Sequence, residues 1–364
     1  MAAGWPYRAP VWLPGGHAQT LCTALWGRSN CIPPLAFKRQ RWFTPDGDFI
    51  DADWLERLPR PSAGTAQGRH PAAGAHDNTP LGMGGGITLA LFHGLEGSSR
   101  SHYAKTFAAE ARRRGWTFVL PHFRGCSGPI NLAPRVYHSG DHEEIAWMLR
   151  RIREQVGPNG QLYAVGVSLG GNALLRWAQE AQKVGKAGGP AHLAVAAVAA
   201  VSAPLDLAAA GNAIDSGPNR WLYAQMFLRT MKLKARSKGQ QFPGLFDLQR
   251  ALTARTLREF DDAFTAPLHG FAGVDDYWSR AAAKPGLAAI ELPALLLNAR
   301  NDPLVPASSL PQAGGEVGSA VTLWQPETGG HVGFPGGLRW GDAGAQWDLQ
   351  VMPAAVCEWL AAQG

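Results

Sequence analysis

The segment Gly166-Val167-Ser168-Leu169-Gly170 has the residue types and spacing of a reactive serine at a sharp turn. It follows the apolar run Leu162–Val165 and precedes a helix-like segment, Asn172–Gln182. The glycines allow a tight strand-to-helix turn, which would expose the Ser168 hydroxyl above the end of the strand. The same turn would aim the N–H of Leu169 at the place where negative charge develops on a reacting carbonyl. We therefore predict that Ser168 is the nucleophile of an acyl-transfer reaction.

Such a serine needs a general base and a carboxylate that orients the base. Asp302 comes shortly after the apolar run Ala294–Asn298, and His331 follows another run, Val321–Trp324. Both side chains would then lie at the C-terminal edge of a parallel sheet, where ligands bind in open α/β folds. The order Ser168, Asp302, His331 is the order of an α/β-hydrolase triad.

Asp206 is the competing carboxylate. It follows the apolar run Val195–Val201, and some hydrolases place the acid one strand earlier than the run before Asp302. The order of the motifs favours Asp302, but Asp206 stays open as an alternative at this point.

A glycine-containing segment, His93-Gly94-Leu95-Glu96-Gly97, follows the apolar run Leu89–Phe92. Its glycines would let backbone N–H groups approach a reacting carbonyl, so the N–H of Leu95 is the predicted second oxyanion donor beside that of Leu169. We expect His93 to shape this loop rather than to act as the base.

From residue 87 onward, apolar runs alternate with helix-like segments, which predicts a parallel sheet covered by helices on both faces. The expected strands are Ile87–Phe92, Thr117–Leu120, Leu162–Val165, Val195–Val201, Ala294–Asn298 and Val321–Trp324. The expected helices are Tyr103–Arg114, Glu143–Val156, Asn172–Gln182 and Ala354–Ala362. Before them, Phe37–Phe43 and Phe49–Leu55 flank a Pro-Asp-Gly turn and predict an antiparallel hairpin.

Two segments interrupt this rhythm. The range Leu207–Lys284 contains the amphipathic pieces Asn219–Lys234 and Leu248–Phe264, and an insertion here would lie over the C-terminal ends of the strands as a helical cap. Arg60–Gly86 is rich in Gly, Ala, Pro and His, and we expect a flexible surface excursion. The predicted organisation is one domain, residues 1–364, with the cap insertion at 207–284.

Composition narrows the function classes. The 364 residues are 46% hydrophobic and 17% charged with a net charge of +6, which is typical of a globular protein with a large core. The cations are scattered, whereas a nucleic-acid binder concentrates them on one face. Four distant cysteines without a CxxC pair indicate neither a disulfide framework nor zinc. Without a signal-like N-terminus or an apolar run long enough for a bilayer, the expectation is a soluble, reduced, cytoplasmic protein.

One stretch within the expected cap suggests a weak contact with a membrane. Five apolar residues are followed by a basic run, and together they could rest on an anionic lipid surface. The alternative is a solvated charged face over an apolar stripe that packs on the sheet. The residues are Trp221, Leu222, Met226, Phe227 and Leu228, then Arg229, Lys232, Lys234, Arg236 and Lys238.

A second cluster raises the question of a metal. His138, Asp141, His142, Glu143 and Glu144 lie within seven positions, and such side chains can hold a divalent ion. The segment matches neither HExxH nor a calcium loop, and a charged helix start explains it as well. We expect no metal and no cofactor.

A series of motifs in this order resembles the YheT-like group of α/β-hydrolases and spans nearly the whole chain. The motifs are Trp12-Leu13-Pro14-Gly15-Gly16-His17-Ala18-Gln19-Thr20, Thr44-Pro45-Asp46-Gly47-Asp48-Phe49, His93-Gly94-Leu95-Glu96-Gly97-Ser98-Ser99, Phe123-Arg124-Gly125-Cys126-Ser127-Gly128, Tyr137-His138-Ser139-Gly140, Gly166-Val167-Ser168-Leu169-Gly170-Gly171-Asn172, Asn298-Ala299-Arg300-Asn301-Asp302-Pro303 and Gly329-Gly330-His331-Val332-Gly333-Phe334.

The resemblance implies an α/β-hydrolase fold, with a mostly parallel central sheet and a helical cap, and an esterase that acts on acyl esters. Ser168, Asp302 and His331 coincide with the triad positions of the group. Related eukaryotic members act on lipid esters such as monoacylglycerols. The long Arg60–Gly86 excursion and Glu144, where relatives often carry Asp, are departures.

The expected function is therefore cleavage of carboxylic esters, either short-chain esters or acylglycerol-type lipids, through an acyl-enzyme on Ser168. A catalytically silent protein that binds a small apolar ligand in the same pocket is the alternative from another class. Thioesterase or amidase chemistry on the same three side chains is the alternative among enzymes.

Overall fold

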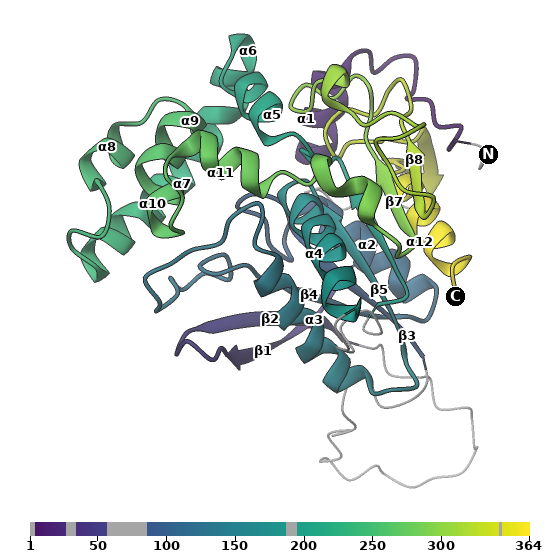
Figure 1. Cartoon of the computed structure of the whole chain (residues 1–364). Helices are drawn as coiled ribbons and strands as arrows, with labels where there is room; N and C mark the ends of the chain where they lie inside the picture. Colours follow the sequence, from purple (N-terminus) through teal and green to yellow (C-terminus); the bar gives the residue numbers. More distant parts are fainter. Residues whose placement is uncertain (1–3, 27–33, 57–85, 187–194, 342–343) are drawn as a thin grey trace, which may run out of the picture.

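The computed structural model describes residues 4–26, 34–56, 86–186, 195–341 and 344–364. Most of the expected excursion at 60–86 lies outside these ranges. Figure 1 shows a central sheet with helices on both sides and a separate group of helices, α5 to α11, beyond one end of it.

The central sheet has eight strands in the order β1-β2-β4-β3-β5-β6-β7-β8. The hairpin of β1 and β2 has the predicted boundaries and pairs antiparallel with β4, whereas β3 to β8 run parallel to one another. This confirms the prediction of a mostly parallel α/β sheet. The strands are β1 (Phe37–Phe43), β2 (Phe49–Leu55), β3 (Ile87–Phe92), β4 (Thr117–Pro121), β5 (Gln161–Val167), β6 (Ala197–Val201), β7 (Ala294–Leu297) and β8 (Val321–Trp324).

Helices cover both faces of the sheet because the strands are apolar on both sides. In β3, Leu89 and Leu91 belong to the core under α2 (His102–Arg113) and α12 (Val351–Ala361), while Ala90 and Phe92 face the core under α3 and α4. Successive strand residues point to opposite faces, so a continuous apolar strand fills two cores at once. The helices of the second core are α3 (His142–Val156) and α4 (Leu169–Lys186).

The chain between β6 and β7 contains helices and no strand, and we call this segment the cap. It lies to one side of the sheet in Figure 1. The helices are α5 (Leu207–Ile214), α6 (Gly217–Asn219), η2 (Arg220–Ala224), α7 (Gln225–Gln241), α8 (Leu248–Thr253), α9 (Leu257–Phe260), η3 (Asp261–Thr265), α10 (Ala266–Leu268), α11 (Val274–Ala281) and η4 (Lys284–Ala289). The division of the chain into one domain with a cap at 207–284 stays a prediction.

Three details differ from the expectation. The amphipathic piece 248–264 is interrupted at Ala254, which has an extended backbone, so α8 and α9 are separate helices. The sequence patterns missed α1 (Gly16–Trp26) and a small hairpin, β9 (Leu338–Gly341) with β10 (Gly344–Trp347). None of the helices in the described ranges combines the length and apolar character needed to cross a bilayer.

Candidate active site

Ser168 lies at the turn between β5 and α4, with a positive φ of 53°. A non-glycine residue adopts this conformation rarely, so its surroundings must hold it there. A Cβ on Gly166 would lie 2.4 Å from the Gly170 carbonyl oxygen, and one on Gly170 would lie 2.4 Å from that of Phe92. The two flanking glycines are therefore required for the strand and helix to approach each other around the serine.

Ser168, His331 and Asp302 form a continuous hydrogen-bonded chain. His331 Nε2 lies 3.0 Å from Ser168 Oγ, and His331 Nδ1 lies 2.8 Å from Asp302 Oδ2. The Asp302 side chain is fully buried, while that of His331 is 12% exposed. The structure thus brings together the three side chains that the sequence predicted as a triad, from the loops after β5, β7 and β8.

The rest of the Asp302 carboxylate is held by the backbone. Its Oδ1 accepts the N–H groups of Leu304 and Val305 at 2.8 and 3.2 Å. Asp206, the competing acid, instead accepts the N–H of Ala209 and caps the start of α5. The structure therefore places Asp302, and not Asp206, next to the imidazole.

The loop after β3, which we call the oxyanion loop, carries Gly94, Leu95 and Glu96. Only one of these three consecutive backbone N–H groups is unpaired among the described residues. The N–H of Gly94 donates to the Tyr103 hydroxyl and that of Glu96 donates to the Tyr137 hydroxyl, both at 2.9 Å. Between them, the N–H of Leu95 has no acceptor among the described residues, and Leu95 lines the same pocket as Ser168. The N–H of Leu169, at the first position of α4, is also unpaired there. Both predicted donors are thus free to bind a ligand oxygen.

His93 has a structural place under this loop. It is fully buried, its Nδ1 donates to the Gly94 carbonyl, and its Nε2 accepts the N–H of Phe123. Burial lowers the pKa of His93 to about 3, which keeps the ring neutral and both hydrogen bonds intact. The expectation that His93 shapes the loop agrees with these contacts.

The missed helix α1 supports the loop that carries His331. Thr20 Oγ1 accepts the N–H of His331 at 2.8 Å, and Gln19 Oε1 accepts the N–H of Gly329 at 2.8 Å. Asn301, one residue before Asp302, accepts the N–H of Gly330 and donates to Gln19. Gln19 and Thr20 belong to the first motif of the family resemblance, which was the signal available in the sequence, although it assigned them no role.

A pocket that is partly open to solvent adjoins Ser168 and His331 and is lined mainly by apolar side chains of the cap. Glu96 and Lys234 contribute charges, but they form an ion pair of 2.6 Å with each other. Asp261 also lines the pocket, and burial raises its pKa to about 6. The main apolar residues are Leu207, Ile214, Phe227, Met231, Leu257, Phe260, Phe264 and Val305.

The acidic cluster considered as a metal site has other partners. Asp141 accepts the N–H of Glu144 as the cap of α3 and pairs with Arg135, while Glu144 pairs with Arg124 at 2.6 Å. Arg124 also contacts the hairpin-turn residue Asp48 at 2.7 Å. Among the residues that the structure describes, no three His, Cys, Asp or Glu side chains are placed to share an ion.

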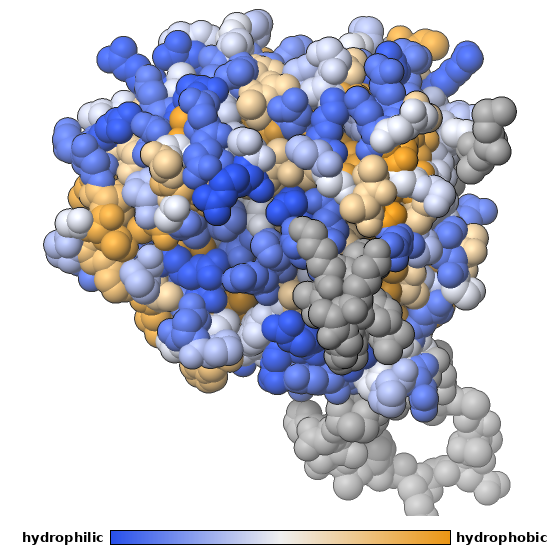
Figure 2. Space-filling view, in the orientation of Figure 1, coloured by the Kyte–Doolittle hydropathy of each residue, from blue (hydrophilic) through white to orange (hydrophobic). Residues whose placement is uncertain are grey.

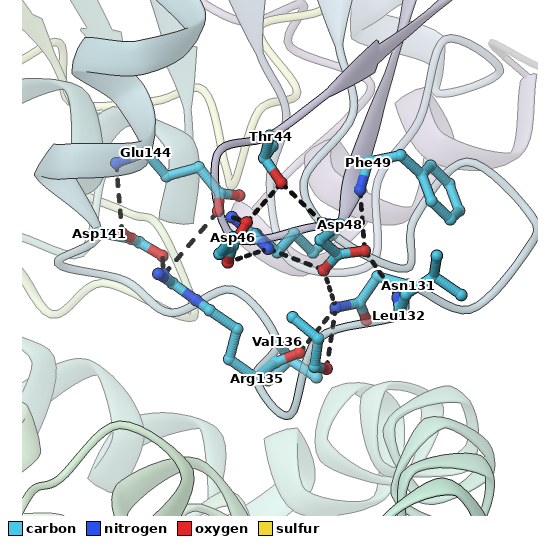
Figure 3. Close-up of polar contacts among 12 residues, drawn as sticks. Thr44, Asp46, Asp48, Phe49, Asn131, Leu132, Arg135, Val136, Asp141 and Glu144 are labelled. Carbon is cyan, nitrogen blue, oxygen red and sulfur yellow. Dashed lines mark hydrogen bonds and ion pairs between the residues drawn. The ribbon is translucent and has the colours of Figure 1, made fainter.

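This buried network fixes one wall of the pocket. Asn131 donates to Asp48 and to the Arg135 carbonyl, so the chain between Arg124 and Val136 is tied to the hairpin (Figure 3). The following residues, 136–139, line the pocket. His138 is among them, and burial lowers its pKa to about 3.

The chain is similar to known hydrolases. Residues 87–338 match the model of the alpha/beta hydrolase fold family. The Escherichia coli (strain K12) protein named "Putative esterase YheT" is 37% identical over 325 residues, which cover 85% of this chain and 86% of that protein. The chain belongs to the YheT-like group of α/β-hydrolases.

More distant relatives of this YheT-like hydrolase carry lipase names. Human "Phospholipase ABHD3" is 27% identical, with 91% of this chain and 74% of that protein covered. Mouse "Monoacylglycerol lipase ABHD2" is 26% identical, with 96% of this chain and 79% of that protein covered. The family is therefore one of hydrolases with esterase, phospholipase and acylglycerol lipase members.

Proposed function

We propose that this YheT-like hydrolase cleaves carboxylic esters through an acyl-enzyme on Ser168. The observation that carries the proposal is the hydrogen-bonded chain from Asp302 through His331 to Ser168, which opens onto an apolar pocket. A buried carboxylate, an imidazole and a hydroxyl that lines the pocket, in this order, are the parts of a general-base-activated nucleophile.

In the proposed mechanism, His331 Nε2 takes the Ser168 proton as Oγ attacks the ester carbonyl. The N–H groups of Leu95 and Leu169 stabilise the oxyanion, because neither donates a hydrogen bond to another group of the described residues. Asp302 keeps the proton of His331 on Nδ1 and stabilises the imidazolium. His331 then protonates the leaving alcohol and later activates the water that releases the acid.

The lining of the pocket supports an acyl ester as substrate. Apolar side chains of the cap surround most of the space beside Ser168, and the charges of Glu96 and Lys234 neutralise each other. An uncharged hydrocarbon chain suits such a lining. We therefore propose short-chain or acylglycerol-type esters, in line with the names of the relatives.

The test is hydrolysis of p-nitrophenyl esters of increasing chain length, with monoacylglycerols included, by the wild type and by Ser168→Ala. Loss of the nucleophile should lower kcat on the order of a millionfold, and a fluorophosphonate probe should no longer label the protein. Ser216→Ala is the matched control, because Ser216 is exposed and lies outside the pocket. Unchanged turnover by Ser168→Ala would refute the mechanism, and failure of the wild type to react with the probe would favour a silent binding protein.

A further inference from the structure

The outer face of one cap helix exposes large apolar side chains in an unusual number. α6, η2 and α7 follow one another without a break from Gly217 to Gln241. On this helix Trp221 is 75% exposed, Leu222 44%, Met226 54% and Leu233 56%. Clustered exposed apolar residues of this size mark an interaction surface more often than single ones do.

These residues share one stripe with cations. Positions 222, 226, 229, 233 and 236 recur at intervals of three and four, so they lie on the same side of a helix. This side of the helix therefore carries both apolar and basic side chains, namely Leu222, Met226, Arg229, Leu233 and Arg236. We call this set, together with Trp221 and Lys232, the outer stripe.

Negative charge is missing from this part of the chain. Between Asp215 and Asp247 the sequence has no Asp or Glu, but it has six Lys and Arg. Two of the six point inward, where Lys234 pairs with Glu96 and Lys238 donates to the carbonyls of Asn131 and Ala133. Within the described ranges, Arg229, Lys232 and Arg236 have no carboxylate partner.

The inner side of the same helix faces the active site. Phe227, Met231 and Lys234 line the pocket that contains Ser168 and His331. A single helix thus separates the pocket from the outer stripe. Figure 2 shows hydrophobic and hydrophilic residues next to one another on the end of the molecule that the cap helices form.

We propose that the outer stripe binds the surface of an anionic lipid bilayer. Apolar side chains that enter the interface and cations that remain at the level of acidic headgroups are the two contributions on which surface binding of a helix depends. A second copy of the chain fits less well, because a symmetric contact would place the unpaired cations against one another. Docking of this kind brings the pocket next to a source of acyl lipids, but the binding itself does not depend on the proposed hydrolysis.

The experiment is sedimentation with vesicles of phosphatidylcholine alone and of phosphatidylcholine with about one third phosphatidylglycerol. We expect binding to the anionic vesicles that weakens as salt rises. The triple variant Arg229→Gln, Lys232→Gln, Arg236→Gln and the single variant Trp221→Ser should each lower the partition coefficient about tenfold or more. None of the four residues lines the pocket, so turnover of a water-soluble ester should not change.

Matched controls lie elsewhere on the surface. Phe43→Ser removes a side chain that is 76% exposed on β1. The triple variant Lys38→Gln, Arg100→Gln, Arg150→Gln removes three exposed cations outside the cap. Equal binding to both kinds of vesicle, or an equal loss in the controls, would overturn the proposal. Self-association that Trp221→Ser abolishes, without vesicle binding, would instead identify an interface between copies and would also overturn it.

Discussion

Replacing Asp302 with Asn exchanges a hydrogen-bond acceptor for a donor beside the His331 ring. Oδ2 of Asp302 lies 2.8 Å from His331 Nδ1, while Oδ1 accepts the N–H groups of Leu304 and Val305. In the variant these two backbone donors hold the amide oxygen, so the amide NH₂ must face Nδ1. Nδ1 then accepts a hydrogen bond, the ring proton moves to Nε2, and Nε2 can no longer take the proton of Ser168.

We expect kcat of Asp302→Asn on p-nitrophenyl butyrate to fall about ten-thousandfold, because the wrong tautomer of the base has an effect of this size in a related triad. This corresponds to about 5 kcal/mol of transition-state stabilisation. The melting temperature should change little, since Asn has the same shape and keeps both backbone hydrogen bonds. Stopped assays at high enzyme concentration and thermal unfolding measure the two quantities.

Asp206→Asn is the matched control. Asp206 caps α5 through the N–H of Ala209 at 2.9 Å, and Asn is as good a helix cap as Asp. Its activity should stay within about threefold of the wild type. Retention of more than a tenth of the activity by Asp302→Asn, or a comparable loss in Asp206→Asn, would show that the tautomer argument is wrong.

Three further predictions follow from contacts around the site. Thr20→Val removes the hydroxyl that accepts the His331 N–H and should lower kcat about ten- to hundredfold at similar KM. Thr20→Ser keeps this hydroxyl, and its kcat should stay close to that of the wild type. Gly170→Ala should destabilise the protein by several kcal/mol in urea, because its Cβ would meet backbone of β3, whereas Gly337→Ala meets nothing within 4 Å and should be neutral. Burial raises the pKa of Asp261 to about 6, so the folded state favours the protonated form. The contribution of the Asp261 carboxyl to the free energy of unfolding is therefore fully present below about pH 4 and is lost as the pH rises to 6. Across this range the free energy of unfolding of the wild type should fall, relative to that of Asp261→Asn, by up to about 1.4 kcal/mol per pH unit. Parallel curves of unfolding free energy against pH for the two proteins would contradict this.

The parts of the site that could be predicted from the sequence are those with a local cause. Glycines at 166 and 170 permit the turn at Ser168, and the apolar runs before Asp302 and His331 predict strands that end where a ligand binds. The β1–β2 hairpin was also predicted with its boundaries, because two short runs that flank a Pro-Asp-Gly turn are a local pattern of neighbouring residues.

Other features depend on contacts between distant residues, and local patterns could not predict them. Thr20 and His331 are 311 positions apart, and only the packing of α1 against the loop after β8 brings them together. Asp206 and Asp302 both follow apolar strands, so the choice between them required the position of the imidazole. The exposure of the outer stripe is a similar case, since an amphipathic pattern does not tell which apolar residues the rest of the protein covers. Side-chain chemistry and short spacing are properties of the chain itself, whereas burial and long-range pairing arise from packing, which joins segments that the sequence separates.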